Sequence, residues 1–329
     1  MSIAVIGGGS WGTALAAHLA RAGARPRLWA REPEVVAGIR AERRNPWFLA
    51  DVDLPAGIEA TIDLAAAVQG ADLVVVAVPS EFVAATLKDM AALPDGVAIV
   101  SATKGLDPTR HVRMSEVIEE RFPRAPVAVL SGPTFAREVV LGQPTAAVVA
   151  SRDERLSSEL QRRLGTRDFR LYTNRDLVGV EMGGALKNVM AIATGIADGL
   201  GLGENARAAL ITRGLAEMTR LAVALGAVPA TLAGLAGLGD LVLTCTGGLS
   251  RNRQLGMALA RGQRPAEVER QTRMIAEGAR TVGSALALAR RHDVSLPICA
   301  EVGAVLFEDK PPAEALAALL GRAATREDG

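Results

Sequence analysis

The first apolar run of this chain leads directly into three glycines with the spacing of a phosphate-binding turn. Residues 3–6 (IAVI) have strand length, and Gly7, Gly9 and Gly12 follow in a G-x-G-x-x-G pattern that opens a helical pattern. Gly7 permits a tight turn, Gly9 lets the backbone approach a pyrophosphate, and Gly12 lets the helix pack closely on the strand. The alternative is a glycine-rich turn with a structural role only. The position between strand and helix favours a dinucleotide-binding turn, with free helix-start amides facing the phosphates.

Short apolar runs alternate with helical patterns through the first half of the chain. After the first strand, we expect further strands at residues 27–29, 72–78, 97–101, 127–130 and 146–150. Continuous apolar strands separated by helices indicate a parallel sheet that is buried on both faces. The sequence therefore predicts the α/β class, with an N-terminal doubly wound sheet of the Rossmann type.

The second half of the chain has a different character. β-Branched runs disappear, Ala, Leu, Glu and Arg dominate, and helical patterns cover residues 206–225 and 281–291, with glycine-rich breaks at 199–203 and 234–239. We interpret this half as all-helical. The sequence thus predicts a dinucleotide-binding domain over residues 1–180 and a helical substrate-binding domain over residues 181–329, without a low-complexity linker between them.

Composition disfavours several classes of protein. The 329 residues include 37 basic and 36 acidic side chains, so no field of one sign attracts nucleic acid or a membrane surface. Three Trp, one Tyr and six Phe are a poor supply for base stacking. Two cysteines make no disulfide framework and fit a reducing cytoplasm. No signal peptide is expected. No apolar run approaches the roughly 18 residues that a membrane span needs. The chain is therefore expected to be cytoplasmic, with no membrane span and no nucleic-acid partner.

The end of the second strand bears on the choice of cofactor. An Asp or Glu at this place favours NAD, because a carboxylate bonds the ribose hydroxyls. Here Arg31 follows the strand and Glu32 comes one place later. Arg31 is suited to hold the 2′-phosphate of NADP, although a solvated arginine that begins a helix is the alternative. Glu32 keeps NAD open.

Polar loops follow the third, fourth and fifth expected strands. They contain Pro79-Ser80, Thr103-Lys104-Gly105 and the segment 131–136 (SGPTFA). Because ligands lie outside the carboxyl ends of strands in such a sheet, we expect these loops to share a rim with the glycine turn. Lys104 then brings a cation near an anionic substrate or the cofactor, while Gly132 offers a backbone amide and Thr134 a hydroxyl. The alternatives are a solvated surface lysine and a simple chain reversal.

A lysine lies in the middle of an apolar helical pattern. Lys187 has no Asp or Glu at the i±3 or i±4 positions of the run 180–192. Burial of an unpaired ammonium is costly and lowers its pKa, so a lysine of this kind can transfer a proton near neutral pH. Asn188 beside it is suited to bond a substrate hydroxyl. The alternative is a lysine that snorkels to the surface.

A third cluster of polar residues lies between 240 and 252. A helix would place Asp240 and Thr244 on one face, and Ser250-Arg251-Asn252 begins the next helical pattern. An arginine beside free helix-start amides is suited to hold a phosphate, although an Asp cap and a solvated arginine fit the same spacing. Cys245 is interpreted as a packed residue, and the three histidines are scattered, so we predict neither a histidine base nor a metal site.

Six ordered blocks together carry a likeness to a known family. The chain resembles the NAD(P)-dependent glycerol-3-phosphate dehydrogenases of bacterial type from Ile3 to about Arg322. The matching blocks are residues 7–14 (GGGSWGTA), 102–106 (ATKGL), 131–136 (SGPTFA), 184–188 (GALKN), 237–241 (GLGDL) and 250–253 (SRNR).

The resemblance implies reversible reduction of dihydroxyacetone phosphate to sn-glycerol 3-phosphate with NADP or NAD, feeding phospholipid synthesis, in a homodimer. It makes Lys187 the proton donor and acceptor at the substrate C2 oxygen and places Arg251 on the phosphate. Together with the reasoning above, the candidate substrate-binding residues are Lys104, Gly132, Thr134, Lys187, Asn188, Asp240, Thr244, Ser250, Arg251 and Asn252. The candidate cofactor-binding residues are Gly7, Gly9, Ser10, Trp11, Gly12, Arg31, Lys104, Ala136, Arg251, Ile275 and Glu277.

Two other functions remain open at this point. A 2- or 3-hydroxyacid dehydrogenase of similar build would use Arg251 to anchor a carboxylate. A dinucleotide-sensing or scaffold protein would bind the cofactor without turnover, although a sensor has no need of a buried lysine.

Overall fold

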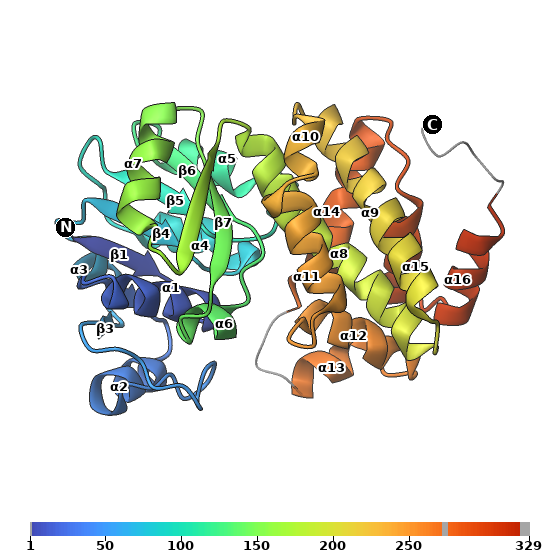
Figure 1. Ribbon diagram of the computed structural model, residues 1–329, viewed down its shortest axis with the longest axis horizontal. Coiled ribbons are helices and arrows are strands. Elements are labelled where there is room, and N and C mark those ends of the chain that lie inside the picture. The colour runs from blue at the N-terminus through green and yellow to red at the C-terminus, as the bar shows by residue number, and fades with distance from the viewer. Residues whose placement is uncertain (1, 272–275, 323–329) are drawn as a thin grey trace.

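The computed structural model describes residues 2–271 and 276–322, and it has a sheet-containing half followed by a helical half (Figure 1). The described residues form an eight-stranded sheet in the order β3-β2-β1-β4-β5-β6-β7-β8. The strands are β1 (Ile3–Ile6), β2 (Arg27–Trp29), β3 (Glu59–Thr61), β4 (Leu73–Val76), β5 (Ala98–Ser101), β6 (Val127–Ser131), β7 (Thr145–Ala150) and β8 (Phe169–Asn174). The expected α/β class with a Rossmann sheet and a helical C-terminal half is confirmed.

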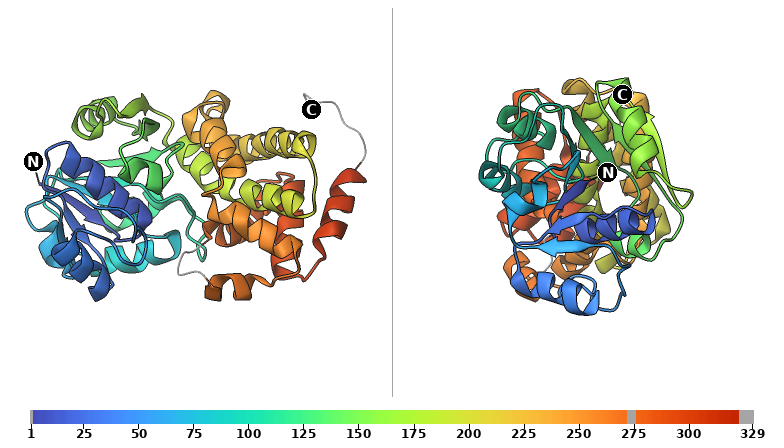
Figure 2. Two further views of the ribbon diagram at one scale, coloured as in Figure 1. Left: turned by 60° about the horizontal axis from the view of Figure 1, so that its bottom comes forward. Right: turned by 90° about the vertical axis from the view of Figure 1, so that its left-hand side faces the viewer.

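Helices cover both faces of the sheet, as the end-on view in Figure 2 shows. They are α1 (Ser10–Arg21), α2 (Pro33–Glu42), α3 (Leu64–Val68), α4 (Ser80–Asp89), α5 (Met114–Arg121), α6 (Ala136–Val140) and α7 (Glu154–Leu164). Separate apolar clusters lie on the two faces, one around Val5, Leu28 and Val100 and the other around Ile6, Val74 and Ile99. This burial on both faces explains why β1, β4 and β5 are continuous apolar runs.

The helical half contains α8 (Leu177–Gly199), α9 (Glu204–Ala224), α10 (Pro229–Leu232), the π-helical turn η1 (Leu235–Gly239), α11 (Asp240–Thr246), α12 (Arg251–Ala260), α13 (Pro265–Gln271), α14 (Glu277–Arg291), α15 (Pro297–Phe307) and α16 (Pro312–Leu320). Helix α8 lies at the centre of this half, and α16 lies at its outer edge (Figures 1 and 2). The domain boundary near residue 180 stays a prediction, although the last strand ends at Asn174 and α8 begins at Leu177.

Most strand predictions are confirmed, with the third one shortened to Leu73–Val76. Two strands were missed. β3 is only three residues long and polar (EAT), and β8 (FRLYTN) alternates buried and exposed residues before ending in an exposed polar stretch. Neither one has the continuous apolar run that marks a strand buried on both faces.

The sheet is not all-parallel, which corrects the expectation from sequence. β7 pairs antiparallel with β6, with Ser131 opposite Val148 and Val129 opposite Ala150, and β8 runs parallel to β7. The chain therefore leaves β8 at the edge of the sheet opposite the carboxyl ends of β5 and β6. From there α8 begins, with Leu177 and Val180 packed against Val129 and Ala150, and it runs back toward the rim where the glycine turn lies.

The two glycine-rich segments have different structures. Between α8 and α9 the chain breaks as expected, with Gly201 at a φ of 79°. Residues 234–239 were expected to form a second break, but after Gly234 they form a π-helical turn that runs directly into α11. The prediction was wrong because glycines here permit close packing and do not end the helical path.

One apolar segment is long enough to meet the length and composition of a membrane span, contrary to the expectation from sequence. Pro229–Thr246 has a mean hydropathy of 1.3 over 18 residues, and 44% of it is buried inside the structure. It consists of α10, η1 and α11 rather than a single straight helix. It also carries Asp240, whose carboxylate forms ion pairs with two lysines. Within the described residues, this segment belongs to the core around the site.

Candidate active site

The three glycines of the first turn have the close contacts that their spacing predicts. Gly7 has a φ of 122°, and a Cβ on it would lie 2.7 Å from Ala77 O. A Cβ on Gly12 would lie 1.9 Å from Gly7 O, so only glycine lets α1 approach β1. A Cβ on Gly9 meets nothing within 4 Å, which leaves open space beside the helix start at Ser10. This cradle has the room and the free amides that a pyrophosphate needs.

Asn45 supports this turn from behind, and sequence reasoning missed it. Its fully buried side chain donates to Gly8 O and to Thr13 Oγ1, both at 2.8 Å. Its Oδ1 accepts the backbone amides of Trp47 and Phe48 at 3.2 Å. One side chain therefore joins the glycine turn, α1 and the loop after α2. No motif marks it, because the atoms that it holds in the glycine turn and α1 lie more than thirty residues away.

Arg31 lies just beyond β2 with its side chain 70% exposed. Its guanidinium lies 3.2 Å from the Glu32 carboxylate and 5.5 Å from the centre of the Phe82 ring at the start of α4. The Arg31 guanidinium is therefore accessible from the surface, while it contacts the Glu32 carboxylate and the Phe82 ring. This arrangement keeps both the 2′-phosphate assignment and the NAD alternative open.

Trp11 and Lys104 connect the glycine turn to the rim. Trp11 Nε1 donates to Ala102 O at 3.0 Å, and Lys104 Nζ lies 5.9 Å from the centre of the indole ring. Ala136, the first residue of α6, packs against the same apolar cluster as Trp11. The expected convergence of the glycine turn with the loops after β5 and β6 is therefore present in the structure.

Lys104 is enclosed by three acceptors and is not a surface lysine. Its Nζ lies 2.7 Å from Gly132 O, 2.9 Å from Thr134 Oγ1 and 2.7 Å from Asp240 Oδ2. The carbonyl of Gly132 contacts the lysine, and the expected role of its amide toward a substrate stays a prediction. Burial lowers the pKa of Lys104 to about 8, with the charge of Lys187 acting in the same direction and Asp240 opposing both. This ammonium can therefore lose its charge at mildly alkaline pH.

Lys187 is buried as expected, but it is not unpaired. Its Nζ lies 2.6 Å from Asp240 Oδ1 and 2.9 Å from Thr244 Oγ1, and the residue is 6% exposed. The prediction of an unpaired ammonium was wrong because the i±4 rule examines only the lysine's own helix. The counter-ion comes from α11, 53 residues further along. The burial also excludes a lysine that snorkels to the surface.

Asp240 and Thr244 lie on one face of α11, as their spacing predicts. Asp240 is 1% exposed, and its two carboxylate oxygens bond the two different lysines. Thr244 Oγ1 also donates to Asp240 O at 2.6 Å, within the helix. Asp240 is thus a bridge between two cations, and the alternative of an Asp cap does not apply.

Asn188 and Asn252 form a hydrogen-bond chain that crosses the site. Asn188 Nδ2 donates to Lys104 O at 3.1 Å, and Asn188 Oδ1 accepts from Asn252 Nδ2 at 2.9 Å. Asn252 Oδ1 in turn accepts from Gly278 N at 2.9 Å. The amide of Asn188 thus holds the loop after β5 against α8 and α12, and its predicted contact with a substrate hydroxyl stays a prediction.

The start of α12 carries the remaining predicted residues. Ser250 is the N-cap and accepts from Arg253 N at 3.3 Å, while Arg251 is the first residue of the helix and is exposed.

Glu277 begins α14 and is half-buried. Desolvation raises the pKa of its carboxyl, and the charge of Arg251 opposes this shift. Ile275 lies outside the described residues, so its assignment stays a prediction.

Two buried carboxylates outside the predicted set hold α8 in place. Asp198, near its end, lies 2.6 Å from Arg207 Nη2 and 2.7 Å from Arg253 Nε. Glu181, near its start, accepts from Ser115 N at 2.8 Å and pairs with Arg113 at 3.0 Å. Sequence reasoning missed both because their partners lie on other helices.

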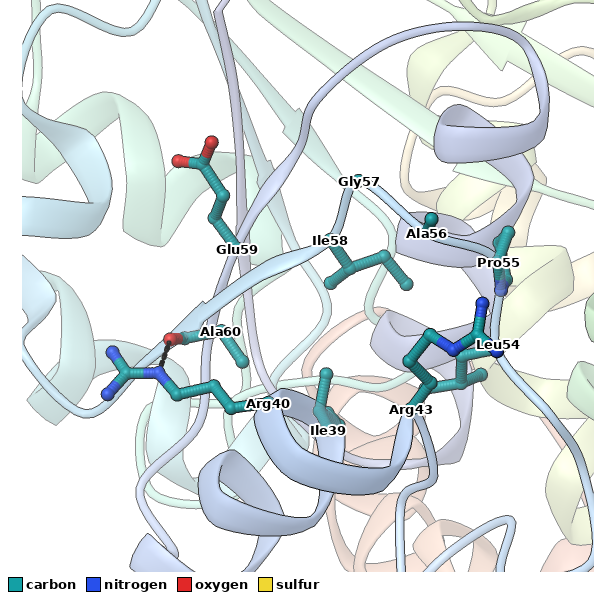
Figure 3. Close-up of a pocket in the computed structure, with 10 residues that line it drawn as sticks. All are labelled: Ile39, Arg40, Arg43, Leu54, Pro55, Ala56, Gly57, Ile58, Glu59 and Ala60. Carbon is teal, nitrogen blue, oxygen red and sulfur yellow. Dashed lines mark hydrogen bonds between the residues drawn. The ribbon is translucent and has the colours of Figure 1, made fainter.

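Two hollows among the described residues lie away from this cluster. One, of about 470 Å³, lies between α2 and the segment that leads into β3; Arg40 donates there to Ala60 O (Figure 3). The other, of about 410 Å³, lies between the β7–β8 edge and η1. Neither hollow is lined by a predicted site residue. The candidate site is therefore identified by its two buried lysines and their shared carboxylate.

The arrangement is suited to an anionic substrate and to proton transfer. Two ammonium groups share one carboxylate at the carboxyl ends of β5 and β6, beside the phosphate-binding turn. The described residues contain no group of three or more His, Cys, Asp or Glu side chains that could hold a metal ion.

Comparison with known proteins gives matches along nearly the whole chain. The family descriptions "NAD-dependent glycerol-3-phosphate dehydrogenase N-terminus" and "C-terminus" match residues 2–157 and 176–317. The NAD(P)+ glycerol-3-phosphate dehydrogenase of Koribacter versatilis is 52% identical, over 99% of this chain and 98% of its own. That of Geobacter metallireducens is 51% identical, over 99% of both chains. A crystal structure of glycerol-3-phosphate dehydrogenase from Coxiella burnetii superposes with a TM-score of 0.94, at 43% identity, over 98% of this chain and 99% of the other.

Proposed function

This chain belongs to the NAD-dependent glycerol-3-phosphate dehydrogenase family, and from that premise we propose that it catalyses the reversible reduction of dihydroxyacetone phosphate to sn-glycerol 3-phosphate. The expected resemblance, the oxidoreductase class and the use of NAD or NADP are confirmed. The observation that carries the proposal for the site is the buried Lys187–Asp240 pair beside the glycine turn.

The glycine turn fits the phosphates of the cofactor. Open space at Gly9 leaves room for a pyrophosphate at the start of α1, and Gly7 and Gly12 allow the tight geometry. Arg31, Trp11, Ser10, Ala136 and Glu277 are the further candidate contacts. When bound, the reduced nicotinamide supplies a hydride to the substrate carbonyl carbon.

Lys187 is proposed to donate the proton to the substrate C2 oxygen, and to accept it in the reverse direction. Its contact with Asp240 keeps the ammonium in place and orients it, while Thr244 holds a second of its protons. A preorganised cation that faces a developing alkoxide contributes roughly 3 kcal/mol per good donor. Lys104 adds a second positive charge near the same oxygen.

Arg251 is proposed to hold the substrate phosphate, with Ser250, Asn252, Gly132 and Thr134 around it. Arg251 is exposed at the first position of α12, where free helix-start amides add to its charge. A fixed phosphate positions the reacting carbon, so binding energy far from the reaction is used for orientation.

We further propose that the protein is a cytoplasmic homodimer that supplies glycerophospholipid synthesis. The family resemblance supports the dimer and the pathway. Two buried free cysteines, Cys245 and Cys299, fit a reducing compartment. Light scattering of the purified protein tests the dimer directly.

The first experiment follows the reduced-nicotinamide absorbance with dihydroxyacetone phosphate, in parallel with NADH and NADPH. Loss of absorbance with either cofactor supports the proposal, and the two rates rank the cofactors. Cofactor binding without turnover would refute it. Competition by inorganic phosphate separates this function from a hydroxyacid dehydrogenase, because only a phosphate pocket is expected to respond strongly.

A further inference from the structure

Gly183 lies one helical turn before Lys187 on α8 and touches the π-helical turn that leads into Asp240. A Cβ on Gly183 would lie 2.4 Å from Ala236 O and 3.2 Å from Gly237 Cα. Both atoms belong to the backbone of η1, so no side-chain rotation can relieve the clash. The turn therefore reaches α8 this closely only because residue 183 has no side chain.

The π-helical turn is also closely packed against the residues that precede it. A Cβ on Gly237 would lie 2.0 Å from Leu232 O in α10. Asp240 follows the turn without an intervening loop residue and is the first residue of α11. A displacement of η1 therefore carries Asp240 with it. π-Helical turns are rare and are frequently found at functional sites.

We propose that Gly183 is a positioning residue: its close contact with η1 sets the distance between the Asp240 carboxylate and Lys187. The inference rests on the proposed function, in which Lys187 carries the proton. Gly183 and Lys187 lie four residues apart on the same helix, so they face the same neighbouring segment. The approach of η1 to α8 therefore determines both the space at Gly183 and the 2.6 Å ion pair.

A methyl group at position 183 has two expected consequences. It moves η1 away from α8, which lengthens the contact of Asp240 with Lys187. It also changes the contact of Asp240 with Lys104, which comes from the loop after β5. The glycine turn between β1 and α1 lies on other elements, so cofactor binding is expected to remain.

The main test compares Gly183→Ala with Gly283→Ala. Gly283 is an exposed glycine within α14, and a Cβ on it meets nothing within 4 Å, so this variant adds the same methyl to a helix without a clash. We expect Gly183→Ala to lower kcat by about 10- to 100-fold, as a misplacement of about 1 Å does, with the cofactor Kd unchanged. Gly283→Ala is expected to match the wild type. A folded Gly183→Ala protein with wild-type kcat would overturn the inference.

The pH dependence distinguishes positioning from a general loss of structure. The charged groups that face Lys104 are Asp240 on α11, Lys187 on α8 and Glu277 on α14. Asp240 raises the pKa of Lys104 against its burial, so retreat of Asp240 lowers that pKa further below about 8. The alkaline limb of kcat/KM is then expected to move to lower pH in Gly183→Ala. A loss of active protein alone lowers the whole profile without moving it, and that result would also overturn the inference.

A longer carboxylate gives a rescue experiment. Asp240→Glu reaches about one methylene further, so the double variant Gly183→Ala/Asp240→Glu is expected to be more active than Gly183→Ala. An equally inactive double variant counts against the inference. If Gly183→Ala gives no folded protein, Gly237→Ala is expected to displace the same turn through its clash with the Leu232 backbone, and the same measurements apply to it.

One readout does not depend on turnover, so failure of the proposed function remains distinguishable. The chain has only four lysines, Lys88, Lys104, Lys187 and Lys310, which makes lysine NMR titration practical. A lower pKa of Lys104 in Gly183→Ala supports the positioning role even if dihydroxyacetone phosphate is not reduced. An unchanged Lys104 pKa would contradict that role even in an active enzyme.

Discussion

Lys187 Nζ lies 2.6 Å from Asp240 Oδ1, and the two side chains are 7% and 1% exposed. A buried ammonium without a counter-ion destabilises the fold. For this reason, removing one partner of a buried ion pair typically costs about 3–5 kcal/mol of folding free energy. The same carboxylate also contacts Lys104. One negative charge thus faces two positive ones, and this excess favours an anionic substrate.

Loss of the Lys187 ammonium is expected to abolish most of the turnover. Lys187→Ala removes the proposed proton donor but leaves the glycine turn intact, so kcat is expected to fall at least about 100-fold, in the range of a lost general acid. Steady-state kinetics measure kcat, and fluorescence titration measures the cofactor Kd, which is expected to be unchanged. A near-normal kcat would remove Lys187 from proton transfer.

The charge of Lys104 is expected to set the alkaline limit of the reaction. Burial lowers its pKa to about 8, so the group is a cation below that pH and loses its charge above it. The kcat/KM for reduction is therefore expected to fall as pH rises through about 8. Lys104→Arg is expected to shift this fall to higher pH, because guanidinium stays protonated. The exposed Lys88→Arg is the control, and an unmoved limb in Lys104→Arg would assign it to another group.

Removal of the Arg251 guanidinium is expected to weaken substrate binding. Arg251→Ala should mainly raise KM for dihydroxyacetone phosphate and reduce inhibition by inorganic phosphate, because both depend on the same anion contact. The exposed Arg261 at the other end of α12 provides the control variant Arg261→Ala. An unchanged KM in steady-state assays contradicts the phosphate assignment.

The support that Asn45 gives to the glycine turn is expected to appear in cofactor binding. Asn45→Ala leaves Gly8 O and Thr13 Oγ1 without their 2.8 Å partner in a buried place, which costs about 1–3 kcal/mol. We expect a lower melting temperature and a weaker cofactor Kd, with kcat at saturating cofactor less affected. Calorimetry and titration measure the two effects, and a wild-type cofactor Kd argues against a role in the turn.

Arg31 is expected to distinguish the two cofactors. Among the candidate cofactor residues, Arg31 is the one that follows β2 with a positive charge suited to the 2′-phosphate. Arg31→Ala removes this charge, so KM for NADPH should rise while KM for NADH changes little. The exposed Arg25→Ala serves as the control. Equal changes for both cofactors would indicate a general role in the adenosine pocket instead.

Local patterns were sufficient for much of the fold. The glycine spacing predicted the turn because Gly7 and Gly12 each have a steric reason at their own position and Gly9 leaves open space at the helix start. Apolar runs predicted β1, β2 and β4 to β7 because burial on both faces leaves a continuous hydrophobic signal. The same rule missed β3 and β8, which lie outside that doubly buried centre, and it gave no sign that β7 reverses direction.

Long-range partners were not accessible to the same reasoning. Lys187 stood out as a lysine among apolar residues, but its counter-ion lies on α11 and only the fold brings it near. The contact of the Asn188 amide with Lys104 O was not predicted, and its role as a substrate ligand stays a prediction. Asn45 carries no pattern at all, because its role depends on the meeting of a loop and a turn. The sequence therefore indicated which polar side chains to examine, such as Lys187, but not the contacts from other elements that orient them.

Because β7 and β8 run opposite to the other strands, α8 begins at the far end of the sheet and must carry Lys187 back to the rim. Asp176 caps the start of the helix by accepting from Gly179 N at 2.8 Å, and Lys187 lies about 16.5 Å further along the helix axis, at the rim. Each residue of an α-helix advances the chain by about 1.5 Å and turns it by about 100°. A single deletion between the cap and the lysine would swing the ammonium away from Asp240 rather than merely shorten its reach. The number of residues between Asp176 and Lys187 is therefore expected to be fixed, because it sets both the height and the direction of the lysine relative to Asp240.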